Sequence, residues 1–254
     1  MKENSIKILN YYINLSIDDI DFKSFPYIIN TINPHSYFIA KHDYIFKCAL
    51  LESDFLAPDG IGIVLASKIL QRTSLKRVTG ADIHSYLLKF AEKNSWKVIY
   101  LGSTYNTLQK IKVRLSVEYP NIKFYGYSPP FKSEFNEIDN AKIISIINKV
   151  HPNIVFLGMT APKQEKWVYL NKSKLNTDII ASVGAVFDFY ARTVKRPDKI
   201  WQHIGLEWLI RLIHEPKRLW FRTFVSMPVF IIDLFRELIK NTLSYIKKCK
   251  FLIC

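Results

Sequence analysis

Short apolar runs alternate with longer amphipathic stretches over residues 1–191. The apolar runs end at or next to Gly, Pro, Ser or Asn, where strands commonly give way to loops. They predict strands at residues 6–13, 27–31, 97–102, 122–127, 154–158 and 178–183. Between them, apolar residues at helical spacing predict helices at residues 81–93, 104–118, 137–150 and 162–171.

Strand–helix alternation with nearly continuous apolar strands is typical of a parallel sheet that helices cover on both faces. We therefore predict an α/β fold built on a mostly parallel sheet. In such sheets ligands bind beyond the carboxyl ends of the strands, so binding residues are expected in the loops that follow the strands.

The last quarter of the chain has a different pattern. Pro197, Pro216 and Pro228 predict short helices separated by breaks, and from Val229 to Ile246 apolar residues recur at helical spacing opposite charged ones. Residues 192–254 hold 13 Lys or Arg against 5 Asp or Glu, a net charge of +8. A basic amphipathic helix is typical of a membrane-surface element. We predict a core domain at residues 1–191 and an arginine-rich, membrane-associating appendage at residues 192–254.

The whole chain has 36 Lys and Arg against 22 Asp and Glu, a net charge of +14. This excess indicates an anionic partner: a nucleic acid, a phosphorylated substrate or an acidic membrane surface. Cys48, Cys249 and Cys254 are odd in number and lack CxxC spacing, which disfavours a disulfide scaffold and a structural zinc site. We read no signal peptide and no apolar run of about 18 residues, so we expect a cytoplasmic protein without a transmembrane helix.

Asp59 is the first candidate for chemistry. It lies in the segment APDG (residues 57–60), which follows the apolar residues Phe55 and Leu56. A carboxylate on a loop between a strand and a helix is suited to act as a general base. The alternative is that Asp59 caps the helix expected to begin near Ile61, and the spacing by itself favours this capping role.

Two further strand-to-helix loops could bind a ligand. In residues 158–167 (GMTAPKQEKW), Gly158 precedes a helix start whose amides would favour a phosphate, and Lys163 and Gln164 could reach a diphosphate or a sugar hydroxyl. An ordinary turn with a solvated polar face explains this pattern equally well. In residues 183–189 (VGAVFDF), Gly184 precedes Asp188, whose carboxylate could bind a ribose or a base, although a turn in the core is the simpler interpretation.

Other chemistries have weaker support. Residues 101–104 (LGST) contain Gly102 but lack the GxGxxG pattern, which disfavours a nicotinamide-dependent oxidoreductase or an epimerase. Residues 19–21 (DID) match a DxD metal motif, but their position indicates a solvated turn. The six His residues show no HExxH, so we predict no metal site and no cofactor.

Three arginines of the appendage form another candidate set. Arg211, Arg218 and Arg222 are spaced by seven and four residues, which would place them on one helical face. Three converging guanidinium groups would suit a diphosphate. The alternative is a basic face against lipid headgroups, and Pro216 interrupts the run.

Several short motifs follow one another in a specific order and spacing. They are TINP (31–34), APDG (57–60), KRVTGAD (76–82), APKQEKW (161–167), VGAVFD (183–188), KRP (195–197), GLEWLIR (205–211) and EPKR (215–218). Together they resemble the WecG/TagA/CpsF family of bacterial glycosyltransferases. One departure is Arg192, where many relatives carry Gly.

The resemblance implies an inverting, metal-independent glycosyltransferase with a Rossmann-like core. Such an enzyme would move a sugar, N-acetylmannosamine or a related hexose, from a UDP donor to an undecaprenyl-diphosphate-linked sugar in cell-surface polysaccharide or teichoic acid synthesis. The family's catalytic carboxylate falls on Asp59, and the other residues of its active site fall on Thr31, Arg77 and Gln164. The resemblance also implies that the appendage, with Arg211, Arg218 and Arg222, closes the site and touches the membrane.

Our hypothesis is therefore that Asp59 takes a proton from an acceptor hydroxyl, which displaces UDP with inversion. Stabilisation of the departing diphosphate falls to cations and amides. The expected partners are a UDP-sugar, a lipid-diphosphate-linked acceptor, the inner face of the cytoplasmic membrane and further copies of the chain. The further candidates for substrate binding are Asn33, Gly102, Gly158, Lys163, Gly184, Asp188 and the three arginines.

A nucleic-acid-binding protein is the alternative hypothesis. The net charge and the interleaved Trp and Arg residues of the appendage support it. The concentration of the charge in an amphipathic tail and the lack of a known nucleic-acid module disfavour it. We therefore predict no nucleic-acid partner.

Overall fold

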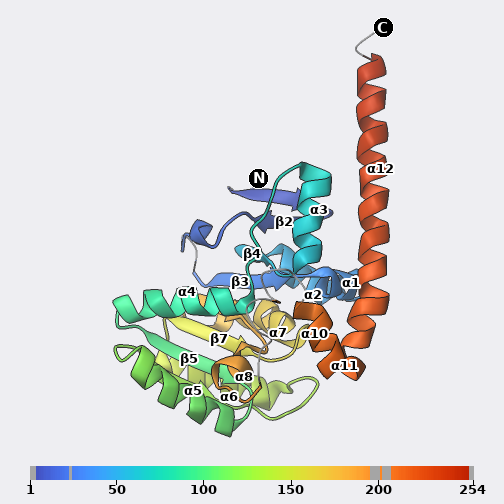
Figure 1. Cartoon of the computed structure of the whole chain (residues 1–254). Helices are drawn as coiled ribbons and strands as arrows, with labels where there is room; N and C mark the ends of the chain where they lie inside the picture. The colour runs from blue at the N-terminus through green and yellow to red at the C-terminus, as the bar shows by residue number, and fades with distance from the viewer. Residues whose placement is uncertain (1–3, 23–24, 195–200, 202–206, 252–254) are drawn as a thin grey trace.

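The computed structural model describes residues 4–22, 25–194, 201 and 207–251. Its centre is a six-stranded sheet with the order β4-β3-β8-β7-β5-β6, in which every neighbouring pair is parallel (Figure 1). This confirms the predicted α/β class. The strands of the sheet are β3 (Tyr27–Ile32), β4 (Phe55–Pro58), β5 (Lys97–Gly102), β6 (Lys123–Tyr127), β7 (Ile154–Gly158) and β8 (Ile179–Ser182).

The N-terminal prediction of one strand over residues 6–13 is wrong. The segment forms a separate antiparallel hairpin of β1 (Ser5–Ile8) and β2 (Tyr11–Asn14). The chain reverses at Leu9, whose φ of 53° lies in the left-handed region. Because Leu9 is apolar, the pattern of hydrophobic residues continues through the turn and hides it.

Helices surround the sheet. The four predicted helices are confirmed to within one residue at each end, and the chain also forms helices on both sides of β4 and after β8. The helices of the core are α1 (Pro34–His42), α2 (Tyr44–Leu51), α3 (Ile61–Gln71), α4 (Gly80–Lys93), α5 (Tyr105–Glu118), α6 (Glu137–Val150), α7 (Lys163–Asn171) and α8 (Val186–Tyr190).

Apolar side chains pack in three clusters. On one face of the sheet, α4, α5 and α8 cover strand residues that include Tyr100 and Phe156. On the other face, α6 and α7 cover residues that include Ile28 and Ile180. The third cluster joins the β1–β2 hairpin to α1, α3 and the C-terminal helix. Both faces of the sheet are thus buried, as nearly continuous apolar strands require.

The carboxyl ends of β5 and β7 approach each other too closely for side chains. A Cβ atom on Gly102, whose φ is 126°, would lie 2.6 Å from the carbonyl oxygen of Gly158. A Cβ atom on Gly158 would lie 2.3 Å from the ring of Phe187, which is itself buried. Glycine at these two positions lets α8 pack across the end of β7.

The described C-terminal helices are α10 (Glu207–His214), α11 (Pro216–Phe221) and α12 (Met227–Phe251). Residues Arg222–Ser226, labelled η3, form a π-helical turn that joins α11 to α12 without a break. The predicted break at Pro228 is therefore wrong, because the chain stays helical through this residue and the π-helical turn directly before it already interrupts the α-helical hydrogen-bond pattern. Pro197 lies outside the described residues.

The first turns of α12 attach the C-terminal segment to the core. Phe230 and Leu234 are buried in the third cluster, and the ring of Phe230 meets Tyr37 edge-on at 5.3 Å between centroids. The Tyr37 hydroxyl and the Lys41 ammonium both donate to the carboxylate of Asp233. Beyond these turns α12 extends away from the rest of the molecule (Figure 1). The division of the chain at residue 191 stays a prediction.

Arg192 begins the C-terminal segment in an unusual backbone conformation. Its φ of 54° lies in the left-handed region that favours glycine. This agrees with the glycine that the resemblance implies at this position in many relatives. The turn still forms with an arginine at this position, and the backbone N–H of Arg192 donates to the carbonyl of Phe189.

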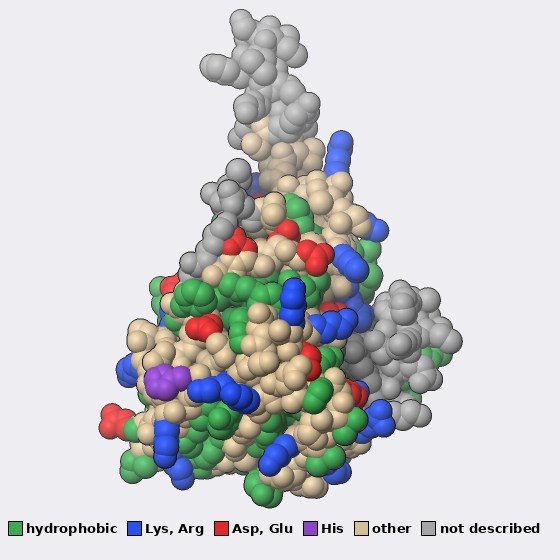
Figure 2. Space-filling view, turned by 90° about the vertical axis from the view of Figure 1, so that its left-hand side faces the viewer, with side chains coloured by type: hydrophobic (Ala, Val, Ile, Leu, Met, Phe, Trp, Pro, Cys, Tyr) green, Lys and Arg blue, Asp and Glu red, His purple; other side chains and the backbone are tan. Residues whose placement is uncertain are grey.

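Basic residues are dispersed over the face of the molecule shown in Figure 2. There the lysine and arginine side chains of the described residues stand among apolar and acidic ones and form no continuous stripe. None of the described helices has both the length and the apolar composition needed to cross a membrane.

The docking of α12 can be tested by two substitutions in the same helix. Phe230 is 1% exposed and Phe235 is 57% exposed. We expect Phe230→Ala to lower the free energy of unfolding by about 3 kcal/mol, because truncating a buried Phe leaves a cavity. Phe235→Ala is the matched control and should change it by less than about 0.5 kcal/mol. Urea unfolding measures both, and equal effects would mean that α12 does not pack on the core.

Candidate active site

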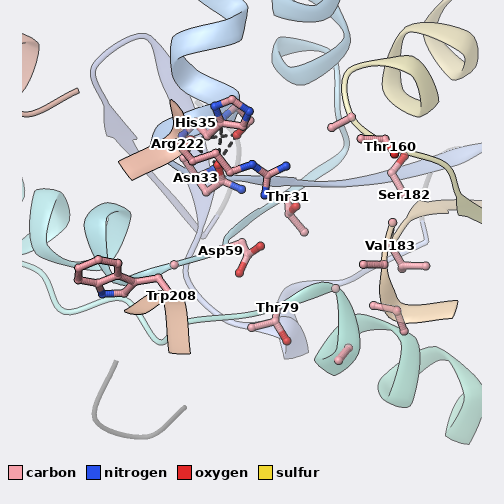
Figure 3. Close-up of a pocket in the computed structure, with 18 of the residues that line it drawn as sticks. Thr31, Asn33, His35, Asp59, Thr79, Thr160, Ser182, Val183, Trp208 and Arg222 are labelled. Carbon is pink, nitrogen blue, oxygen red and sulfur yellow. Dashed lines mark hydrogen bonds between the residues drawn. The ribbon is translucent and has the colours of Figure 1, made fainter. Parts of the chain in front are cut away.

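A cavity of about 490 Å³ opens where β3, β4, β7 and β8 end (Figure 3). The loops after these strands, the start of α1, the segment before α4 and part of the C-terminal helices line it. Parallel sheets bind ligands at this end. All four residues predicted as catalytic line the cavity: Thr31, Asp59, Arg77 and Gln164.

Asp59 lies in the middle of this hollow (Figure 3). It directly follows β4, and its backbone N–H donates to the carbonyl of Ile32 at 2.9 Å. The N-cap of α3 is Gly60, with a φ of 95°, so the alternative that Asp59 caps this helix is wrong. The carbonyl of Pro58, the last residue of β4, accepts from the backbone N–H of Val78. This hydrogen bond places Asp59 beside the segment that contains Arg77.

Thr31 and Asn33 stand at the end of β3. Strand register pairs Thr31 with Ala57, two residues before Asp59. Asn33 is the N-cap of α1, and its Oδ1 accepts from the backbone N–H groups of His35 and Ser36. The side-chain oxygen of Asn33 is thus occupied by the helix N-terminus, so the side-chain nitrogen, Nδ2, is the group that can bind a ligand.

Two guanidinium groups bring positive charge to the cavity. Arg77 comes from the segment before α4 and Arg222 from η3, and both line the cavity. Each is half-buried, where a positive charge acts through less water than at the surface. Guanidinium groups bind phosphate oxygens in a planar, bidentate manner, so these two suit a diphosphate.

His35 links the start of α1 to the C-terminal segment. Its Nδ1 lies 2.9 Å from the hydroxyl of the buried Ser226. Burial, together with the nearby positive charge of Arg222, lowers the pKa of His35 to about 4. The imidazole is therefore neutral at physiological pH and can either donate or accept a hydrogen bond, according to its tautomer.

Gln164 is buried in the first turn of α7 and faces Gly184 across the cavity lining. Its Oε1 accepts from the backbone N–H of Met159, and a Cβ atom built on Gly184 would lie within 4 Å of its amide. Gly184 has a φ of 58° and no side chain, so the amide of Gln164 remains open to the cavity. Gly158 and Asp188 also line it.

Two predicted substrate-binding residues lie away from the cavity. Gly102 is required for the close approach of β5 to β7 and does not belong to the lining. Lys163 turns towards the segment before α6, where its ammonium donates to the carbonyl of Lys132 at 2.5 Å and lies 3.6 Å from the ring centroid of Phe135. The sequence places Lys163 next to Gln164, but consecutive helical residues face different directions.

The remaining arginines of the predicted set have described backbones only. Arg211 lies in α10 and Arg218 in α11, and their side chains are outside the described part of the chain. Arg222 is the member of the set whose side chain the structure describes at the cavity.

The cavity also contains residues that the sequence analysis did not select. His35, Thr79, Thr160, Ser182 and Trp208 all line it (Figure 3). Trp208 belongs to the GLEW motif, so the motif was a signal that could have selected it. Ser182 and Thr160 end or follow strands, and His35 directly follows the TINP motif. The hydrogen bond of His35 to Ser226 could not be predicted, because the two residues are 191 positions apart in the sequence.

Metal-binding side chains are not grouped in the described residues, since no three of His, Cys, Asp or Glu lie close enough together to hold an ion. The DxD-like segment has a structural role. The carboxylate of Asp19 accepts from the backbone N–H of Ser16 at 2.8 Å and caps the short helix η1 (Ile17–Asp19).

The chain is similar in sequence to known proteins. The sequence profile of the "Glycosyl transferase WecG/TagA/CpsF family" matches residues 12–244. A protein of Bacillus subtilis (strain 168) is 30% identical over 210 residues, which are 83% of this chain and 79% of the relative. A protein of Staphylococcus aureus (strain MW2) is 27% identical over 81% of this chain and 78% of its own length.

Both relatives carry the name N-acetylglucosaminyldiphosphoundecaprenol N-acetyl-beta-D-mannosaminyltransferase, as does a relative from Bacillus spizizenii that is 26% identical over 82% of this chain. The profile spans nearly the whole chain, including η3 and most of α12. This chain belongs to the glycosyl transferase WecG/TagA/CpsF family.

Proposed function

We propose that this protein transfers N-acetylmannosamine, or a related hexose, from a UDP donor to a sugar on undecaprenyl diphosphate. One observation carries the proposal: the carboxylate of Asp59 and the guanidinium groups of Arg77 and Arg222 line one cavity at the carboxyl ends of a parallel sheet. A base and two phosphate-binding cations in one cavity are the groups that such a transfer requires. The names of the relatives supply the sugar and the lipid.

The reaction is a single displacement that inverts the anomeric carbon. The carboxylate of Asp59 accepts the proton of the acceptor hydroxyl as its oxygen forms a bond to the anomeric carbon. The bond from that carbon to the diphosphate oxygen breaks, and its electron pair leaves with UDP. Thr31, at the end of the neighbouring strand, provides a hydroxyl on the same side of the cavity as Asp59.

The leaving diphosphate gains negative charge that the protein has to stabilise. Arg77 and Arg222 provide positive charge from two separate segments, and the carboxamide of Gln164 provides hydrogen bonds. We propose that these groups suffice without a divalent ion. Asp188 and the amide nitrogen of Asn33 bind the nucleotide or the sugars.

The outer face of α12 supports a proposed association with the membrane. Phe230 and Leu234 turn towards the core, and the exposed apolar residues fall on the opposite side of the helix at 100° per residue. This apolar stripe consists of Ile231, Ile232, Phe235, Ile239 and Leu243. We propose that the stripe enters the inner leaflet of the cytoplasmic membrane, where the lipid-linked acceptor lies.

Donor and acceptor can be identified by UDP release. We expect release when the protein is mixed with N-acetylglucosaminyl diphosphate undecaprenol and UDP-N-acetylmannosamine, chosen from a panel of UDP-sugars, and we expect EDTA to leave the rate unchanged. Absence of transfer from every UDP-sugar would refute the function. Loss of activity in EDTA with recovery in magnesium or manganese would refute the metal-independent mechanism alone.

The base can be identified by comparing the two aspartates of the cavity. Asp59→Asn should lower kcat by roughly 10²–10⁴, the usual contribution of a positioned general base, while UDP binding by calorimetry stays within about threefold. Asp188→Asn is the matched control and should change mainly KM. The assignment fails if the Asp59 variant turns over at close to the wild-type rate or if the Asp188 variant shows the larger loss in kcat.

The membrane contact can be tested with vesicles that contain phosphatidylglycerol. Phe235→Asp together with Ile239→Asp should lower partitioning by about tenfold or more, because both side chains lose their transfer into the bilayer. Val113→Asp together with Val117→Asp, on the exposed face of α5, removes similar apolar area from another surface and serves as the control. Equal losses in the two double variants would show that the stripe is not the contact.

A further inference from the structure

Glu165 is a buried carboxylic acid in the lining of the cavity. It lies in the first turn of α7 and is 3% exposed. Burial raises its pKa to about 7, against the opposing effects of a hydrogen bond from Gln164 and of its own backbone N–H. A buried carboxyl is costly for folding unless both its oxygens are well bonded.

Hydrogen bonds from the surroundings of Glu165 do not offset the free-energy cost of burying its carboxyl group. Within the described residues, its Oε2 has no hydrogen-bond partner, and neither do Oδ1 of Asn30 and Oγ of Ser182. Asn30 shares a small second cavity with Glu165, and Ser182 shares the main one. Stability therefore gives no reason for a carboxyl at this position, where an apolar side chain of similar size would pack without orphaned polar atoms.

Among the residues that the structure describes, the side chain of Glu165 makes a hydrogen bond to one other side chain, that of Gln164 in the candidate site. Nε2 of Gln164 donates to Oε1 of Glu165 at 2.9 Å, while Oε1 of Gln164 accepts from Met159 at 3.2 Å. The carboxamide is thus held at both ends, which sets the positions of its nitrogen and its oxygen. An NH₂ group has two hydrogens, so one remains for a ligand beside Gly184.

We propose that Glu165 is a positioning residue that fixes the Gln164 carboxamide with its nitrogen, not its oxygen, presented to the donor diphosphate. The inference rests on the proposed function, in which Gln164 meets that diphosphate. A carboxamide rotated by 180° would present its oxygen, an acceptor, to phosphate oxygens that are themselves acceptors. The acceptor Oε1 of Glu165 and the donor N–H of Met159 both oppose this rotation.

Both protonation states of Glu165 keep the acceptor that this role requires. A neutral carboxyl still accepts at its carbonyl oxygen, so Glu165→Gln preserves the bond to Gln164, whereas Glu165→Leu removes it. Several titratable or charged groups face Glu165 across the two cavities and bear on its ionisation. They are Glu52, Tyr169 and Lys172 at the small cavity and His35, Asp59, Arg77, Asp188 and Arg222 at the main one.

The kinetic test is a double-mutant cycle between Glu165 and Gln164. We expect Glu165→Leu to lower kcat/KM for the UDP-sugar by about tenfold to a hundredfold and Glu165→Gln to lower it by no more than about threefold. In the Gln164→Ala background, Glu165→Leu should cause no further loss, because a positioning residue acts only through its partner. Glu52→Gln, which removes a carboxyl from the far side of the small cavity, is the control for charge.

Three kinetic results would overturn the proposal. In the first, Glu165→Leu is as active as Glu52→Gln. In the second, Glu165→Gln and Glu165→Leu lose the same activity. In the third, Glu165→Leu has an undiminished effect in the Gln164→Ala background. Circular dichroism and thermal unfolding show whether each variant is folded.

A spectroscopic readout separates this proposal from the proposed function, because it needs no substrate. The chain has four glutamines, so selective ¹⁵N-glutamine labelling gives four side-chain amide pairs, and Gln164→Ala identifies one of them. In the wild type this pair should shift with a midpoint near pH 7 as Glu165 ionises, and Glu165→Gln should abolish that titration. A Gln164 pair that is insensitive to pH and unchanged by Glu165→Gln overturns the positioning role, whether or not the protein transfers sugar.

Discussion

The parallel register of the central sheet determines where the candidate site lies. Because β3, β4, β7 and β8 run in one direction and are paired in register, their carboxyl ends and the loops that follow share one edge. Thr31, Asp59 and Gln164 come from three of these loops or strand ends and meet in one cavity. The buried, two-sided packing that supports the register therefore also supports the chemistry.

The order and class of the elements could be predicted from the sequence because buried parallel strands are nearly continuous apolar runs. The same property hid the reversal at Leu9, where an apolar residue occupies a left-handed turn. Pro228 misled for a related reason. Its residue type signals a break, but the π-helical turn directly before it keeps the chain helical, and the sequence pattern did not predict that turn.

The sequence identified residues of the cavity lining where they lie at or shortly after a strand end, and missed where side-chain direction matters. Asp59 directly follows β4, Gln164 lies in the first turn of the helix after β7, and both line the cavity. Lys163 is adjacent to Gln164 in sequence but turns towards Lys132, since one residue along a helix rotates a side chain by about 100°. His35 and Trp208 also line the cavity; each lies in or beside one of the short motifs, but no local pattern shows that tertiary packing brings the two motifs together.

The π-helical turn η3 belongs both to the cavity and to the C-terminal helix. Arg222 and Thr223 of this turn line the cavity, Ser226 bonds His35, and α12 continues from the turn without interruption. A tilt of α12 as a rigid rod would therefore displace the guanidinium group of Arg222 relative to Asp59. The proposed diphosphate site and the proposed membrane contact would then depend on one helical segment, so a substitution that changes one would also change the other.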